Sequence, residues 1–101
     1  MALIEVGVIP LGTETPSVSK YVAGAVKILQ DAKDIKYELT AMGTIIEGDL
    51  ARLLSLAEKM HQSVFAAGAM RVVTTIKIDE RRDEVASMKS KLEAVRRELG
   101  H

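Results

Sequence analysis

The chain has 101 residues, of which 48% are apolar and only three are aromatic. This length supports a single domain, expected over residues 1–101, whose small core leaves apolar surface for self-association. Fourteen basic residues balance fourteen acidic ones, which argues against a nucleic-acid partner, because such binders carry an excess of Lys and Arg. Cysteine is absent, and no apolar run approaches the roughly 20 residues that cross a bilayer. We therefore expect a cytoplasmic protein with no membrane partner.

The chain begins with a strand signal followed by a helix signal. Residues 2–9 form a β-prone run that Pro10 is expected to end, because proline cannot donate to a strand ladder. Thr15 and Pro16 then match an N-cap and a first-turn proline. Apolar residues at helical spacing follow, so a helix is predicted over residues 16–32.

The middle of the chain predicts a hairpin and a second helix. Residues 36–42 alternate as a half-buried strand does, and Gly43 turns the chain into a short antiparallel return over residues 44–48. Asp49 is expected to cap the second helix, and Gly68 stands where glycine commonly ends one.

The last third predicts a strand and a charged helix. Residues 70–78 alternate as a fourth strand, and Asp79 is expected to open a third helix that runs to about residue 99. The apolar residues of this helix follow a strict 3-4-3-4 spacing: Val85, Met88, Leu92, Val95 and Leu99. Such a narrow seam is typical of helix-to-helix packing. Two interpretations of the seam are possible: it packs against the sheet edge of the same subunit, or against a helix of another subunit.

The element order is βαββαβ with an extra helix, which predicts a ferredoxin-like α+β fold with two helices on one face of a four-stranded sheet. Strand alternation assigns a mixed polar and apolar set to the open face: Glu5, Gly7, Glu38, Thr40, Ile45, Glu47, Arg71, Val73, Thr75 and Lys77. Two interpretations fit this set. One is cross-strand ion pairing, with Arg71 able to hold Glu47; the other is a ligand pocket where the face meets another subunit.

Catalytic and metal-binding patterns are missing from the sequence. His61 stands alone on the second predicted helix, and no His or Cys pair has the spacing that chelates a metal. No serine lies in a Gly-x-Ser-x-Gly motif, and no glycine-rich phosphate loop is present. We therefore expect no enzymatic activity, no catalytic residues, no metal and no cofactor.

Several blocks in order give the chain a family likeness. They include Ile9-Pro-Leu-Gly12, Tyr37-Glu-Leu-Thr-Ala-Met-Gly-Thr-Ile-Ile-Glu-Gly48 and Arg71-Val-Val-Thr-Thr-Ile-Lys-Ile-Asp79. With these blocks the chain resembles the thiamine-binding protein family of ferredoxin-like domains over nearly its whole length. One difference is Ala41, which stands where the family often has proline.

The resemblance implies a homotetramer that binds thiamine or hydroxymethylpyrimidine without transforming it, for sequestration or sensing. It implies these pocket residues: Ser17, Ser19, Met42, Thr44, Glu47, Arg71 and Thr74 or Thr75. Glu47 could accept hydrogen bonds from an aminopyrimidine, and Met42 could pack against its ring. The alternative is a structural or regulatory assembly module with no small-molecule ligand.

Overall fold

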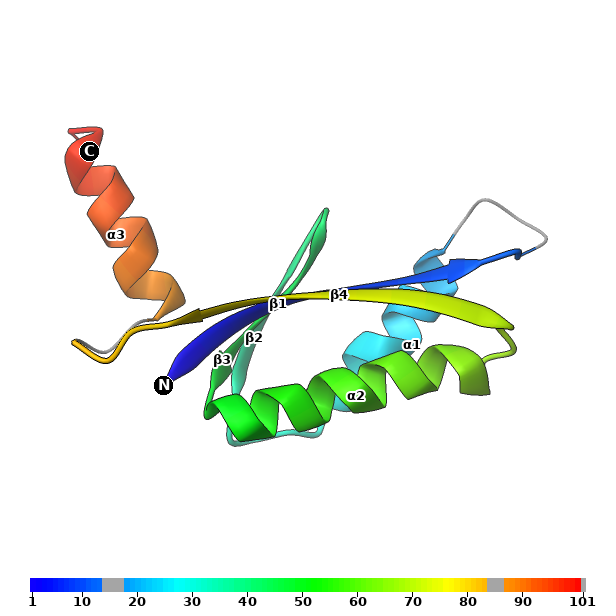
Figure 1. The fold of residues 1–101 in the computed structure, drawn as a ribbon. Coiled ribbons are helices and arrows are strands. Elements are labelled where there is room, and N and C mark those ends of the chain that lie inside the picture. Colours follow the sequence, from blue (N-terminus) through cyan, green and yellow to red (C-terminus); the bar gives the residue numbers. More distant parts are fainter. Residues whose placement is uncertain (14–17, 84–86, 101) are drawn as a thin grey trace.

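The fold is built on a four-stranded antiparallel sheet, with two helices on one face and a third helix above the other (Figure 1). The structure is a computed structural model that describes residues 1–13, 18–83 and 87–100. Its elements, in chain order, are β1 (Ala2–Leu11), α1 (Ser19–Gln30), β2 (Lys36–Thr40), β3 (Gly43–Gly48), α2 (Leu50–Ala66), β4 (Arg71–Glu80) and α3 (Met88–Glu98). The strand order β2-β3-β1-β4 is that of the ferredoxin-like plan, so the predicted fold class is confirmed.

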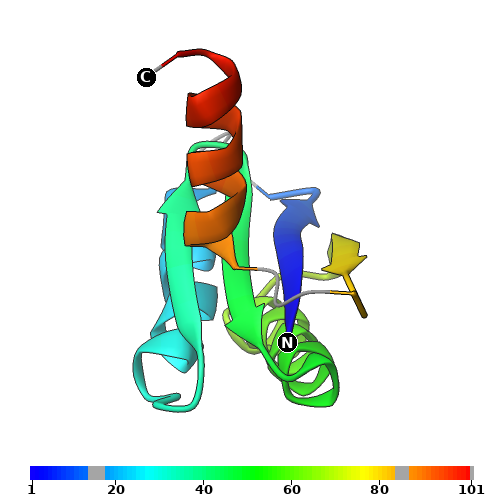
Figure 2. The ribbon, with the colours of Figure 1, turned by 90° about the vertical axis from the view of Figure 1, so that its left-hand side faces the viewer.

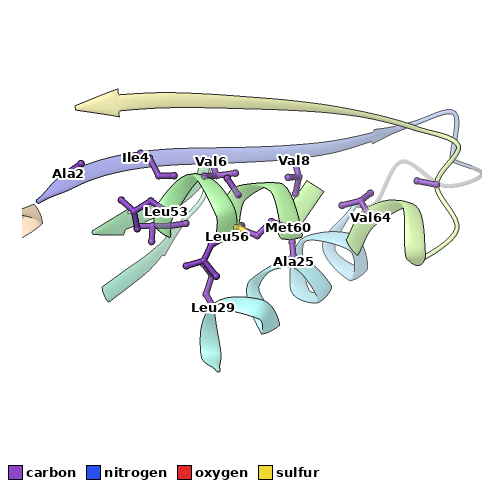
Figure 3. Close-up of a cluster of buried hydrophobic side chains, with 13 residues drawn as sticks. Ala2, Ile4, Val6, Val8, Ala25, Leu29, Leu53, Leu56, Met60 and Val64 are labelled. Carbon is purple, nitrogen blue, oxygen red and sulfur yellow. The ribbon is translucent and has the colours of Figure 1, made fainter. Parts of the chain in front are cut away.

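The core lies between the sheet and the pair α1 and α2 (Figure 3). Even-numbered residues of β1, such as Ile4 and Val6, point into it, and α2 contributes Leu53, Leu56 and Met60. All five side chains are buried, so strand alternation and helical spacing agree on one apolar interface. Burial of this surface is the main stabilising contribution to the domain.

Two local signals act as the sequence predicts, and a hydroxyl contact that was not predicted closes the hairpin. The Asp49 side chain accepts a hydrogen bond from the amide of Arg52 and caps α2. Gly68 follows the end of α2 with a φ of 110°, a backbone region that favours glycine. Thr40 closes the β2–β3 hairpin, because its hydroxyl accepts hydrogen bonds from the amides of Met42 and Gly43.

The predicted start of the third helix at Asp79 is wrong. β4 continues through Asp79 to Glu80, because these residues pair with Leu3 and Ala2 of β1. α3 begins only at Met88, after Ser87, which caps it in a capping box. An acidic residue before a charged segment resembles a helix cap, yet here the neighbouring strand keeps the backbone extended.

Two further boundaries differ from the prediction. β1 continues past Pro10 to Leu11, since its register with β3 ends at Val6 and Thr44, and a strand with a free side tolerates proline. α1 spans Ser19–Gln30 and is therefore shorter at its end than the predicted 16–32. The expected Thr15–Pro16 cap lies outside the described residues.

An ion pair ties the loop before β2 to the first turn of α2. The Arg52 guanidinium donates to the Asp34 carboxylate at 2.9 Å, and this hydrogen bond lowers the pKa of Asp34 below its ordinary value. A depressed pKa contributes stability above the unfolded-state pKa, and the contribution disappears as the pH falls through the folded-state pKa. We therefore expect Asp34→Asn to be slightly less stable than wild type at pH 7, with a difference that shrinks as the pH falls below the ordinary pKa of 3.8, measured by thermal unfolding. A difference that does not shrink in acid would contradict the ion pair.

Candidate functional site

Residues of the open face of the sheet and of α3 line a large hollow of about 680 Å³. Figures 1 and 2 show how α3 rises from this face, on the side opposite α1 and α2. Leu3 and Ile45, from the two central strands, supply apolar lining. The first turns of α3 contribute Met88, Lys91 and Leu92. The hollow therefore combines apolar surface from the sheet with one wall made by the C-terminal helix.

One cross-strand row crosses this hollow. Glu38 of β2 pairs with Ile45 of β3, which pairs with Glu5 of β1, which pairs with Lys77 of β4. All four line the hollow, so the row presents two carboxylates and one ammonium around an isoleucine. The closest approach between Glu5 and Lys77 is 3.9 Å, a distance typical of a loose surface pair.

Two polar contacts position the start of α3 over the sheet. The buried carboxylate of Glu47 accepts a hydrogen bond of 3.0 Å from the amide of Met88. This amide is one of the orphan donors at a helix N-terminus, where negative charge is favoured. Lys91 forms an ion pair with Asp79 at the end of β4. The beginning of α3 is therefore fixed by two carboxylates of the sheet.

A smaller hollow of about 310 Å³ lies where β1 separates from the β2–β3 hairpin. Its lining includes Met42, Thr44 and Thr75, together with residues of α1. Thr40 lines this hollow and the large one. Gly7 also lines it, and a Cβ at this position would lie 3.2 Å from the Thr75 hydroxyl, so the backbone and the hydroxyl are close. The smaller hollow is mostly apolar with hydroxyl groups, in contrast to the charged large hollow.

The structure brings together part of the predicted site. Met42, Thr44 and Thr75 line the smaller hollow, and Ser19 is exposed at the start of α1, next to a residue that lines it. Ser17 lies outside the described residues. These positions gather at the hairpin end of the sheet.

Three predicted site residues lie apart from that group: Glu47, Arg71 and Thr74. Glu47 is buried below the start of α3, while Arg71 pairs with Leu11 at the opposite end of β1 from Leu3, the partner of Glu47. Eight residues of strand correspond to roughly 26 Å, so within one chain Arg71 does not reach Glu47.

Thr74 belongs to the helix-covered face. Its hydroxyl shares a hydrogen bond of 2.6 Å with the His61 ring of α2, and Phe65 meets that ring edge-on. The geometry gives Thr74 and His61 a packing role between α2 and β4. Thr75, its neighbour, faces the other side of the sheet.

The predicted site contains none of the five charged residues that line the large hollow: Glu5, Glu38, Lys77, Asp79 and Lys91. Glu5, Glu38 and Lys77 were assigned to the open face, so alternation located them without marking them as binding residues. Asp79 carries a helix-cap signal in the sequence, and only its pairing with Leu3 of β1 places it beside the hollow. The described residues contain no group of three or more His, Asp or Glu side chains that could hold a metal ion.

The fold and the hollows define a ferredoxin-like domain in which an added helix forms one wall of a cavity large enough for a small molecule. The profile of the thiamine-binding protein family matches residues 4–96, and the chain belongs to that family.

Relatives from bacteria and archaea show the same likeness. The UPF0045 protein YqgV of Bacillus subtilis is 47% identical over 98% of both chains. The crystal structure of MJ1052 from Methanocaldococcus jannaschii superposes with a TM-score of 0.86 at 41% identity, covering 93% of this chain and 94% of that one. A Thermotoga maritima protein described as a thiamine biosynthesis/salvage protein has a TM-score of 0.79 at 18% identity, covering 94% and 98%, and this match supports the fold alone.

None of the described helices combines the length and the apolar character that crossing a bilayer demands.

Proposed function

We propose that this protein is a cytoplasmic, non-enzymatic binder of thiamine or its hydroxymethylpyrimidine portion, acting in sequestration or sensing. The observation that carries the proposal is the large hollow in a member of the thiamine-binding protein family. Its volume of about 680 Å³ falls within the range of small-molecule sites, and its lining mixes apolar surface with a few charged groups.

The chemistry of the large hollow suits an aminopyrimidine. A flat ring can pack on Ile45 and Leu3, and an exocyclic amine can donate to a carboxylate such as Glu38 or Glu5. Thr40 borders both hollows, so a second ring of the ligand could reach the hydroxyl groups and Met42 of the smaller hollow. Two linked rings could therefore extend from one hollow toward the other.

A homotetramer forms part of the proposal, because the apolar stripe of α3 lacks a partner within the described chain. Leu92, Val95 and Leu99 are 50%, 57% and 64% exposed, and no residue of α3 is buried. The radius of gyration is 15.0 Å, whereas a compact domain of this length has about 13 Å. Val85, the first residue of the predicted seam, lies outside the described residues. Packing on a second copy would cover the stripe and complete the wall of the hollow.

Calorimetry tests ligand binding directly. We expect saturable binding of thiamine or hydroxymethylpyrimidine, and about tenfold weaker binding by Glu47→Gln, because the neutral amide loses the charge at the start of α3. Glu58→Gln, an exposed change on α2, is the matched control and should bind as wild type does. The absence of both binding heat and a thermal shift, with either compound at millimolar concentration, would contradict the proposal.

The exposed stripe on α3 also favours a second candidate, a structural or regulatory assembly module without a ligand. In that case the hollow is a subunit interface whose carboxylates pair with groups of a partner. A crystal structure of the assembly distinguishes the two. Partner side chains that fill the hollow favour the assembly module, and an open cavity beside Glu38 and Glu5 favours the binder.

A further inference from the structure

The charges around the large hollow are unequal. Three carboxylates (Glu5, Glu38 and Asp79) and two ammonium groups (Lys77 and Lys91) line it. Both lysines already face carboxylates, because Lys91 pairs with Asp79, and Lys77 lies 3.9 Å from Glu5. The remaining carboxylate is that of Glu38. Within residues 1–13, 18–83 and 87–100, no cation lies within ion-pair distance of Glu38.

The position of Glu38 makes this surplus charge relevant to a ligand. Glu38 lies in the same cross-strand row as Glu5, with Ile45 between them, so the backbones of the two glutamates are roughly 10 Å apart on either side of an apolar residue. A flat ring on Ile45 would have a carboxylate at each end. Lys77 is a poor counterion, because its side chain is 85% exposed and the attraction is screened by water.

We propose that this hollow accepts a cationic, unphosphorylated heteroaromatic ligand and rejects its phosphate esters, with Glu38 as the specificity-determining residue. The inference rests on the proposed function, because thiamine carries a positive thiazolium ring and its esters add negative charge. A cation in the row replaces the counterion that Glu38 lacks. A phosphate in the same place meets that carboxylate, while Lys91 is paired with Asp79 and the charge of the exposed Lys77 is screened by water, so like charges oppose its binding.

Titration calorimetry of the full chain with thiamine and thiamine diphosphate, without added divalent cations, tests the selectivity. We expect wild type to bind thiamine at least about tenfold more tightly than the diphosphate, and this ratio should shrink as salt screens the charges. Glu38→Gln keeps the shape of the side chain and removes its charge. It should weaken thiamine binding severalfold and leave diphosphate binding equal or tighter, so that the ratio falls toward one.

The control is Glu58→Gln, which removes a carboxylate from the exposed surface of α2, away from the hollow. It should leave both affinities and their ratio unchanged. Circular dichroism verifies that each variant is folded, which we expect because Glu38 is exposed on the edge strand β2.

The outcomes separate this inference from the proposed function. Diphosphate binding as tight as thiamine binding overturns the selectivity while the binding function stands. An unchanged ratio in Glu38→Gln overturns the assignment to this residue. No heat with either compound overturns the selectivity together with the proposed function.

Discussion

Leu53→Ala is expected to lower the free energy of unfolding by about 2–5 kcal/mol, the range for removing a buried leucine from a packed core. Leu53 is fully buried on α2, within the cluster shown in Figure 3. Its side chain also lies close to the backbone of β3, because a Cβ placed on Gly48 would be 3.3 Å from it. Truncation therefore leaves a cavity between α2 and the sheet. Small domains have only about 5–15 kcal/mol of stability, so this loss is large.

Leu54→Ala is the matched control for this prediction. Leu54 is the next residue on the same helix and is 38% exposed, so we expect its truncation to cost less than about 1 kcal/mol. Urea unfolding followed by circular dichroism measures both variants at equal protein concentration. Equal losses in the two variants would contradict the assigned core face of α2.

Most of the fold could be predicted from local patterns. The caps of α2, the hairpin at Thr40 and the inward side of β1 are set by neighbouring residues, so the sequence displays them. The end of β4 depends instead on β1, far away in the chain. Asp79 carries a helix-cap signal, and its pairing with Leu3 overrides that signal.

The site could be predicted only in part, for the same reason. Alternation places Glu5, Glu38 and Lys77 on the open face, and the register then aligns them in one row. The wall of the hollow depends on the contact between Glu47 and Met88, which are 41 residues apart. No local pattern shows that a strand carboxylate will position a helix that begins so much later.

The separation of Arg71 from Glu47 gives a second example. Both residues belong to the open face by alternation, which suggests that they can meet. The register of β1 with its two neighbours places them at opposite ends of the sheet. Face assignment needs only a period of two, whereas contact along a strand needs the register.

Leu92→Asp is expected to break the proposed homotetramer into smaller species. Leu92 lies in the middle of the exposed apolar stripe of α3, so a partner helix would bury it. Burial of a leucine contributes about 1.5–3 kcal/mol, and a two-fold interface contains each substitution twice. Loss of about 4 kcal/mol corresponds to roughly a thousandfold weaker association. The far-ultraviolet spectrum should change little, since no residue of α3 is buried within the subunit.

Light scattering after size-exclusion chromatography measures this effect against two further variants. Val95→Asp lies on the same stripe and outside the lining of the hollow, so it should dissociate the assembly without touching a ligand contact. Ala94→Asp adds the same charge on another side of α3 and should leave the mass unchanged. A wild-type mass retained by both stripe variants would show that the stripe is not the interface. Dissociation by all three would mean that charge on α3, and not the apolar stripe, controls assembly.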